Sequence, residues 1–201
     1  VTQTLTVGYF NLQANSLPGI RLWLDANNID GDDTADTITD GTSIIQWIDQ
    51  SGNNNHAGQA TAADRPTYET RSPNDYYFGV NMPQLNFTIA QSLDISSDSN
   101  IRSIVALVRQ NSGQSAVTKP FGGSQNLTTS AQKFALGAID SGAGSDSLSI
   151  VVWQMSPGAY SIYVNGANKG SSTSSLTPGG FDKVGNDFRG EFCEVIAYDR
   201  A

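Results

Sequence analysis

The fold is decided by residues 147–166, whose sequence is SLSIVVWQMSPGAYSIYVNG. Across residues 148–153, and again across 160–164, apolar side chains recur with a period of two, the spacing of a strand that turns one face toward a core. Asn165-Gly166 then offers the positive φ angles of a tight hairpin turn. The stretch therefore predicts adjacent antiparallel strands.

Outward from this stretch, short apolar runs alternate with turns rich in Gly, Ser, Asn and Asp. Further strands are predicted at residues 4–10, 20–24, 83–89, 101–109, 133–139 and 191–198. Residues 42–50 fit either a helical turn or two or an extended segment. Short strands at this spacing are typical of an all-β protein, a two-sheet antiparallel β-sandwich. Sandwiches of this length usually form one domain, so we expect a single domain over residues 1–201.

Charge and cysteine content exclude several classes of function. The formal net charge is −8 with 11 Lys plus Arg, so a nucleic-acid backbone would be repelled and nucleic acid is not an expected partner. The chain has 16 Asp but 3 Glu, and Asp is a residue of turns and cation-binding loops. A lone Cys193 allows neither an internal disulfide nor a Cys-based zinc site.

Location can be inferred only indirectly. No apolar run approaches the roughly 18 residues of a membrane span, so membrane insertion is not expected. Residues 1–3 lack the basic and apolar regions of a signal peptide. We expect a monomeric domain excised from a larger, extracellular surface protein.

Three local motifs carry a family resemblance: Leu22-Trp23-Leu24-Asp25-Ala26, Gln46-Trp47-Ile48-Asp49-Gln50-Ser51-Gly52-Asn53 and Arg65-Pro66-Thr67-Tyr68. They resemble the opening of concanavalin A-like/laminin G-like jelly-roll domains in large bacterial surface proteins. Residues 162–166 and 190–201 are similar to that family's closing hairpin and last strand. The resemblance implies a two-sheet sandwich. Trp23 and Trp47 lie in apolar patterns, so both are expected in its core. Because one fold hosts many functions, it leaves the function open.

The acidic insertion at residues 27–36 is similar to one in the ligand-binding domains of calcium-dependent RTX adhesins. That resemblance implies a cell-surface adhesin module that recognises a peptide or protein on another cell and mediates adhesion. A carbohydrate-binding, lectin-like module on the same scaffold is the alternative. A polysaccharide-degrading enzyme or a spacer without ligand are further interpretations.

A calcium site is predicted in the acidic insertion. A tight turn at Gly31 would direct several carboxylate oxygens inward, and Ca²⁺ takes six to eight oxygen ligands. The proposed metal ligands are Asp25, Asp30, Asp32, Asp36 and Asp49. The alternative is a solvated acidic turn between strands.

A ligand site is predicted where loops gather at the ends of the sheets. Its proposed residues are Asp140, Asp146, Trp153, Asp182, Asn186 and Asp187. The aspartates and the asparagine would bind through a shared cation, and the Trp153 ring would offer a stacking surface. The alternative for each Asp and Asn is a turn-forming role.

Catalysis is not expected from these residues. His56 is the only histidine, so neither a His-based zinc site nor a Ser-His-Asp triad can be built easily. Glu191 and Glu194 are the one close Glu pair, and their odd spacing in a strand predicts side chains on opposite faces. A glycoside hydrolase needs two carboxyl groups across one cleft, so we expect the chain not to be an enzyme.

Overall fold

The computed structural model describes residues 18–32, 34–70, 82–88, 90–111, 118–122, 127–130, 133–136, 139–144, 147–173 and 180–201. The strand predicted at residues 4–10 lies outside this described part of the chain. Within it, the one helical segment is a 3-10 turn at Ala62–Asp64. No described helix is long and apolar enough to cross a membrane.

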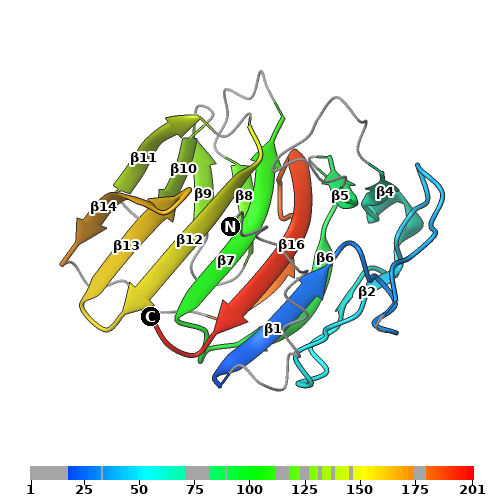
Figure 1. Cartoon of the computed structure of the whole chain (residues 1–201), viewed down its shortest axis with the longest axis horizontal. Coiled ribbons are helices and arrows are strands. Elements are labelled where there is room, and N and C mark those ends of the chain that lie inside the picture. The colour runs from blue at the N-terminus through cyan, green and yellow to red at the C-terminus, as the bar shows by residue number, and fades with distance from the viewer. Residues whose placement is uncertain are drawn as a thin grey trace, which may run out of the picture.

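Two antiparallel sheets face each other in a sandwich (Figure 1). The first sheet has the order β14-β13-β12-β7-β16-β5-β4, with β1 also paired to β16. Its strands are β1 (Ile20–Asp25), β4 (Thr67–Glu69), β5 (Gln84–Phe87), β7 (Ser103–Gln110), β12 (Ser149–Ser156), β13 (Ala159–Val164), β14 (Ala167–Ser172) and β16 (Gly190–Tyr198).

The second sheet has the order β11-β10-β9-β8-β15-β6-β3-β2. Its strands are β2 (Gln46–Trp47), β3 (Ala57–Gly58), β6 (Leu93–Asp98), β8 (Thr118–Phe121), β9 (Leu127–Ser130), β10 (Lys133–Leu136), β11 (Ile139–Gly144) and β15 (Phe181–Val184). The predicted all-β, two-sheet antiparallel sandwich is therefore confirmed.

The predicted hairpin is present at the expected place. Asn165 and Gly166 have φ angles of 50° and 79°, and they join β13 to β14. A mirror-image turn of this kind matches the right-handed twist of the flanking strands. Residues 42–50 are extended, with β2 inside them and a bridge at Ser43, so the extended interpretation holds.

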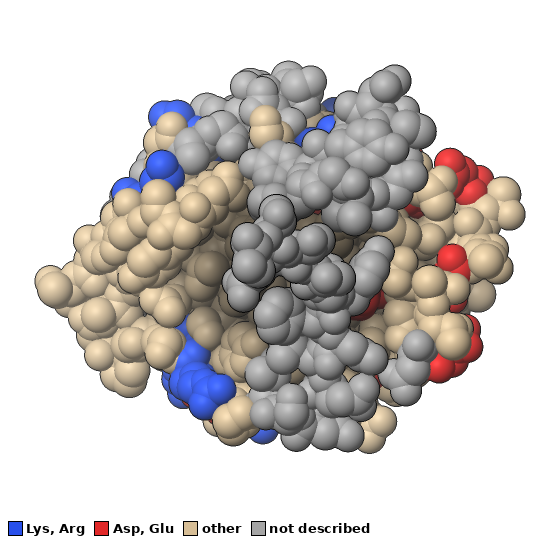
Figure 2. Space-filling model, in the orientation of Figure 1, with Lys and Arg blue, Asp and Glu red and all other residues tan. Residues whose placement is uncertain are grey.

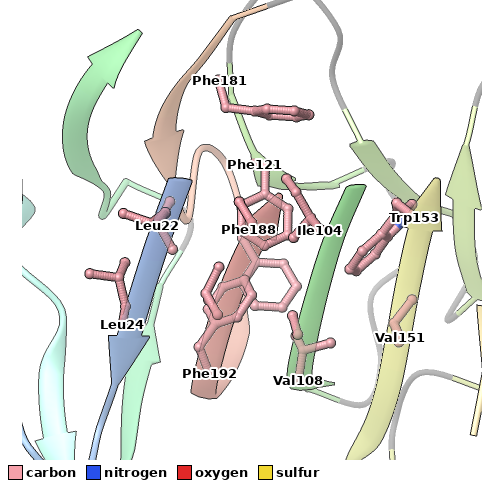
Figure 3. Packing of buried hydrophobic residues seen from close by; sticks show 14 of the residues in the cluster. Leu22, Leu24, Ile104, Val108, Phe121, Val151, Trp153, Phe181, Phe188 and Phe192 are labelled. Carbon is pink, nitrogen blue, oxygen red and sulfur yellow. The ribbon is translucent and has the colours of Figure 1, made fainter. Parts of the chain in front are cut away.

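The core lies between the sheets and is rich in aromatic rings (Figure 3). In β12, the side chains of Val151, Trp153 and Met155 are fully buried, whereas Ile150 is 37% exposed. Trp153 meets the rings of Phe121 and Phe134 edge to face, with centroids 5.6 and 6.0 Å apart. Alternation along each strand therefore leaves every second residue of the first sheet on its outer face, away from the core.

Candidate functional site

Five side chains form a row across the outer face of the first sheet, here called the polar row. They are cross-strand neighbours by register: Tyr198 opposite Ser103, Ser103 opposite Gln154, Gln154 opposite Ser161, and Ser161 opposite Ser171. Four of them alternate with core residues of their own strands, and Ser171 lies opposite Ser161 in the register, so all five lie on the outer face. The Ser161 hydroxyl donates to Gln154 Oε1 at 3.2 Å, which orients the amide.

A shallow pocket of about 230 Å³, here called the serine pocket, lies along the polar row. It is lined by Gln154, Ser156, Ala159, Tyr160, Ser161, Ser171, Ser172, Thr173 and Ala201. Seven of the nine lining residues carry a hydroxyl or an amide group, most of the surface in the pocket is nevertheless apolar, and none of the lining side chains is charged. Hydroxyls donate and accept hydrogen bonds, so the pocket suits a ligand that carries hydroxyls of its own.

Next to the polar row is a second row with apolar and aromatic character. Val105 lies opposite Ile196 and Val152, and Val152 lies opposite Tyr163. These side chains are partly exposed. The outer face therefore places a Tyr ring and aliphatic surface beside hydroxyl and amide groups.

Trp23 also lies on this outer face, which corrects the expectation that it is a core residue. Its neighbours Leu22 and Leu24 enter the core, and Trp23 itself is partly exposed. The indole Nε1 donates to Glu194 Oε1 at 2.9 Å. Trp47 is in the core as predicted, with its Nε1 donating to the Asp25 carbonyl at 2.9 Å.

A pair of carboxyl groups joins β1 to β16. Asp25 lies directly opposite Glu194 in the strand register, on the outer face. Burial raises the pKa of Glu194 to about 7, the Asp25 carboxylate adds to the shift, and the Trp23 N–H opposes it. Burial likewise raises the pKa of Asp25, against a hydrogen bond from the Asn27 N–H. Near neutral pH, Glu194 is therefore only partly ionised, beside the carboxyl group of Asp25.

A β-bulge in β16 brings Glu191 onto the same face as Glu194, which corrects the predicted opposite facing. Phe192 pairs with Val108 and Glu194 with Leu107, so Cys193 is an extra residue that resets the alternation. Glu191 binds Arg109 through both oxygens, at 2.8 and 2.6 Å, and is 4% exposed. With Glu69, whose neighbour Tyr68 enters the core, all three glutamates of the chain lie on the outer face of the first sheet.

The predicted calcium ligands fall into separate environments. Asp30, Asp32 and Asp36 lie in the loop after β1. Asp32 Oδ1 accepts the Thr34 N–H and hydroxyl, which lowers the pKa of Asp32, and Asp36 accepts the Ile29 N–H. Burial raises the pKa of Asp36, and the carboxylates of Asp30 and Asp32 add to the shift.

Asp49 organises its own turn. Its Oδ1 accepts the N–H groups of Trp23 and Ser51, both at 2.9 Å, and its Oδ2 accepts the Ser51 hydroxyl and the Asn55 N–H. His56 Nδ1 accepts the Asp49 N–H at 3.0 Å. Across the described residues, no three His, Cys, Asp or Glu side chains form a group that could hold a metal ion. Calcium binding stays a prediction.

The predicted ligand residues at the sheet ends are brought together only in part. Asp182 and Asn186 both border Gly122: a Cβ there would lie 3.0 Å from Asp182 Oδ1 and 3.3 Å from the Asn186 Cβ. Asp182 Oδ1 is buried and accepts no hydrogen bond from the described residues. Asp187 is exposed with a φ of 54°.

The other two predicted aspartates add little to this site. The Asp140 backbone pairs with Ala135 in β11, and Asp146 lies outside the described residues. A shared site between the two loops stays a prediction.

Trp153 is not a stacking surface, which corrects its prediction as a ligand residue. Its side chain is 0% exposed, and its Nε1 donates to the Ala135 carbonyl at 3.2 Å. Strand β12 is apolar on both sides, so the sequence alone does not say which side faces the core. The polar row was missed for a related reason: Gln154 and Ser161 are visible as polar positions in apolar strands, but their neighbours come from pairing.

The fold recurs in solved structures of a sialidase and of an arabinanase domain. No known family matches the sequence, and no curated protein matches it. Trypanosoma rangeli sialidase in complex with sialic acid is similar to this structure at 17% identity and a TM-score of 0.59, over 92% of this chain and 31% of the sialidase chain. Domain 4 of an extracellular GH43 arabinanase from Geobacillus stearothermophilus, in complex with arabinotriose, is similar at 15% identity and a TM-score of 0.54, over 90% and 92% of the two chains.

These similarities change two expectations. The expectation that the chain is not an enzyme is contradicted, because the similar structures are a sialidase and a domain of a glycoside hydrolase. Its main argument, the opposite facing of Glu191 and Glu194, also falls with the bulge. The likeness to RTX adhesins is not supported by these structures. The chain spans about a third of the sialidase chain, and at these identities the likeness establishes a shared β-sandwich fold.

Proposed function

We propose that the chain is a carbohydrate-binding domain that holds a glycan in the serine pocket on the outer face of its first sheet. The observation that carries the proposal is the polar row, where Gln154 and Ser161 from neighbouring strands are already hydrogen-bonded to each other at 3.2 Å. Side chains that are oriented before the ligand arrives lose less entropy on binding.

The chemistry of the face supports a sugar over a peptide. A sugar presents hydroxyls around an apolar ring face, and the serine pocket places hydroxyls and an amide beside the apolar row that contains Tyr163. A Tyr ring packs against an apolar surface while its hydroxyl group stays in contact with water. Two proteins of the same fold, a sialidase and an arabinanase domain, have been solved with sialic acid and arabinotriose.

Gln154→Ala is expected to weaken glycan binding about 5- to 10-fold, because a hydrogen bond contributes about 1 kcal/mol. Isothermal titration calorimetry with arabino-oligosaccharides and sialyllactose, chosen after a glycan array, measures the change. The control is Thr37→Ala, an exposed residue that does not line the serine pocket. Release of reducing ends in the same incubations reports hydrolysis.

If Gln154→Ala binds glycans with unchanged affinity, the serine pocket is not the binding site. If no glycan on the array binds, the proposed function is wrong. Calcium-dependent capture of peptides, with no glycan bound, would instead favour the adhesin module expected from the sequence.

Calcium is expected to raise the melting temperature by about 5 °C at 10 mM, because a ligand that binds only the native state stabilises it. The physical reason lies in the loop of Asp30, Asp32 and Asp36. Burial raises the pKa of Asp36 and repulsion from Asp30 and Asp32 adds to the shift, and a cation would relieve that repulsion. Calorimetry with calcium and with EGTA measures the shift. Asp32→Asn should reduce the shift, and Asp64→Asn, in the 3-10 turn, should not. Identical transitions with calcium and EGTA would end the calcium prediction.

A further inference from the structure

An exposed arginine stands at one end of the polar row. The Arg200 guanidinium carbon lies over the Tyr198 ring, 5.8 Å from its centroid. Its backbone is held in place, since the Ser103 hydroxyl donates to the Arg200 carbonyl at 2.6 Å. Tyr198 and Ser103 are themselves members of the polar row, and Ala201, the next residue, lines the serine pocket.

The electrostatic surroundings of the pocket differ from those of the rest of the molecule. The net charge is −8, yet no Asp or Glu lines the serine pocket. In Figure 2 the visible acidic side chains gather at the right-hand edge, on the side of β2 and β4, whereas basic side chains appear at the lower left, near the C-terminal end, and along the upper edge.

Two acidic side chains lie closest to Arg200 along β16. Asp199 points toward Gly19, because a Cβ on Gly19 would lie 2.3 Å from Asp199 Oδ1. Glu194 is four residues before Tyr198, about 13 Å along a strand. Burial raises the pKa of Tyr198, the Arg200 guanidinium opposes the rise and the Glu194 carboxyl group adds to it, so the charges of both side chains act on the Tyr198 ring. Arg200 is the guanidinium that lies over that ring, and it brings positive charge to this end of the polar row.

The geometry points to an acidic glycan as the ligand: the Arg200 guanidinium binds a sugar carboxylate, and Gln154 and Ser161 bind the hydroxyls of the same or the adjoining residue. This inference rests on the proposed glycan binding. Tyr198 and Gln154 are two strand spacings apart, about 10 Å, a span that a disaccharide can cover. A uronic or sialic acid is the class of sugar that carries such a group.

The position of Arg200 favours this role on physical grounds. A guanidinium stacked over a ring keeps its planar N–H edge free, and that edge matches a carboxylate with two parallel hydrogen bonds. The neighbouring Arg102 is already engaged, with its Nη1 donating to the carbonyls of Ser99 and Ile101 at 2.7 and 3.1 Å. It adds positive charge at this end of the sheet, while the Arg200 side chain is exposed and donates no hydrogen bond to the described residues.

Arg200→Gln is expected to weaken binding of an acidic oligosaccharide about 10-fold and that of its neutral counterpart less than 2-fold, because charge-assisted hydrogen bonds are the stronger class. The probes are sialyllactose against lactose, and an oligosaccharide containing glucuronic acid against its form with the carboxyl group reduced. The control is Arg189→Gln, which removes an exposed arginine before the other end of β16. Titration at 50 and 300 mM NaCl should weaken only the binding of the acidic probes.

The outcomes separate this inference from the proposed function. Equal binding of acidic and neutral probes, or an acidic preference unchanged in Arg200→Gln, overturns the role of Arg200 and leaves glycan binding in place. No binding of either kind overturns both.

Discussion

Replacing Glu194 with glutamine is expected to stabilise the protein by about 2 kcal/mol at pH 8 and to leave its stability almost unchanged at pH 4. Burial and the Asp25 carboxylate raise the pKa of Glu194 from 4.5 to about 7 in the folded state. Between pH 4.5 and about pH 7, the folded chain therefore still holds a proton that the unfolded chain has released. Glutamine keeps an oxygen for the Trp23 N–H without carrying the charge.

The wild-type protein should accordingly lose stability as the pH rises from about 4.5 to about 7, since the folded state binds more protons there. Asp25, whose pKa is also raised, contributes in the same direction. Asp32, Asp40 and Asp98 have lowered pKa values, so their contributions change below about pH 4, outside this window. Urea unfolding at a series of pH values measures the slope.

Glu191→Gln is the matched control, because it changes the other buried glutamate of the same strand. Glu191 is paired with Arg109, so its loss leaves a guanidinium without its carboxylate and should destabilise the protein at both pH values. A wild-type unfolding free energy that stays level between pH 4.5 and 7 would contradict the raised pKa of Glu194.

Trp153→Ala is expected to destabilise the protein by about 4 kcal/mol, the usual cost of deleting a large buried aromatic side chain. The indole is fully buried between Phe121 and Phe134, and its N–H is bound to the Ala135 carbonyl, so truncation leaves a cavity and an unpaired acceptor. Thermal and urea unfolding followed by tryptophan fluorescence measure the loss.

Trp153→Phe separates the core role from a ligand role. It refills most of the cavity, so it should fold and bind glycans as the wild type does. Trp23→Phe, which changes a partly exposed ring on the outer face, is the comparison. A Trp153→Phe protein of normal stability that no longer binds glycans would place the indole at the ligand site after all.

Much of the fold follows from local pattern. Strands predicted at residues 20–24, 101–109 and 191–198 correspond to β1, β7 and β16, because alternating apolar side chains identify a strand without knowledge of its partners. Weakly apolar strands such as β3 and β14 were harder to recognise. In β14 the side chains are largely exposed, so no core-facing period marks them.

The candidate site was much less predictable. The clustered aspartates predict metal and ligand sites in the loops, yet both carboxylate oxygens of Asp49 accept hydrogen bonds that hold its own turn. Gln154 and Ser161 stand close together in the chain as the two sides of a hairpin, but Ser103, Tyr198 and Arg200 join them only through the pairing of β7 with β12 and β16. No spacing of residues along the sequence predicts the polar row.

The sequence by itself determined the all-β class, the Asn165-Gly166 hairpin and the alternation of each strand, because backbone geometry and turn chemistry act over a few neighbouring residues. Tertiary structure alone decided that Trp153 faces the core while Trp23 does not, and that Glu191 and Glu194 share a face. The physical reason is that both outcomes depend on contacts between distant strands. Both sides of β12 are apolar, and contacts with other strands determine which side packs in the core. In β16, one extra residue shifts the alternation of the side chains that follow it.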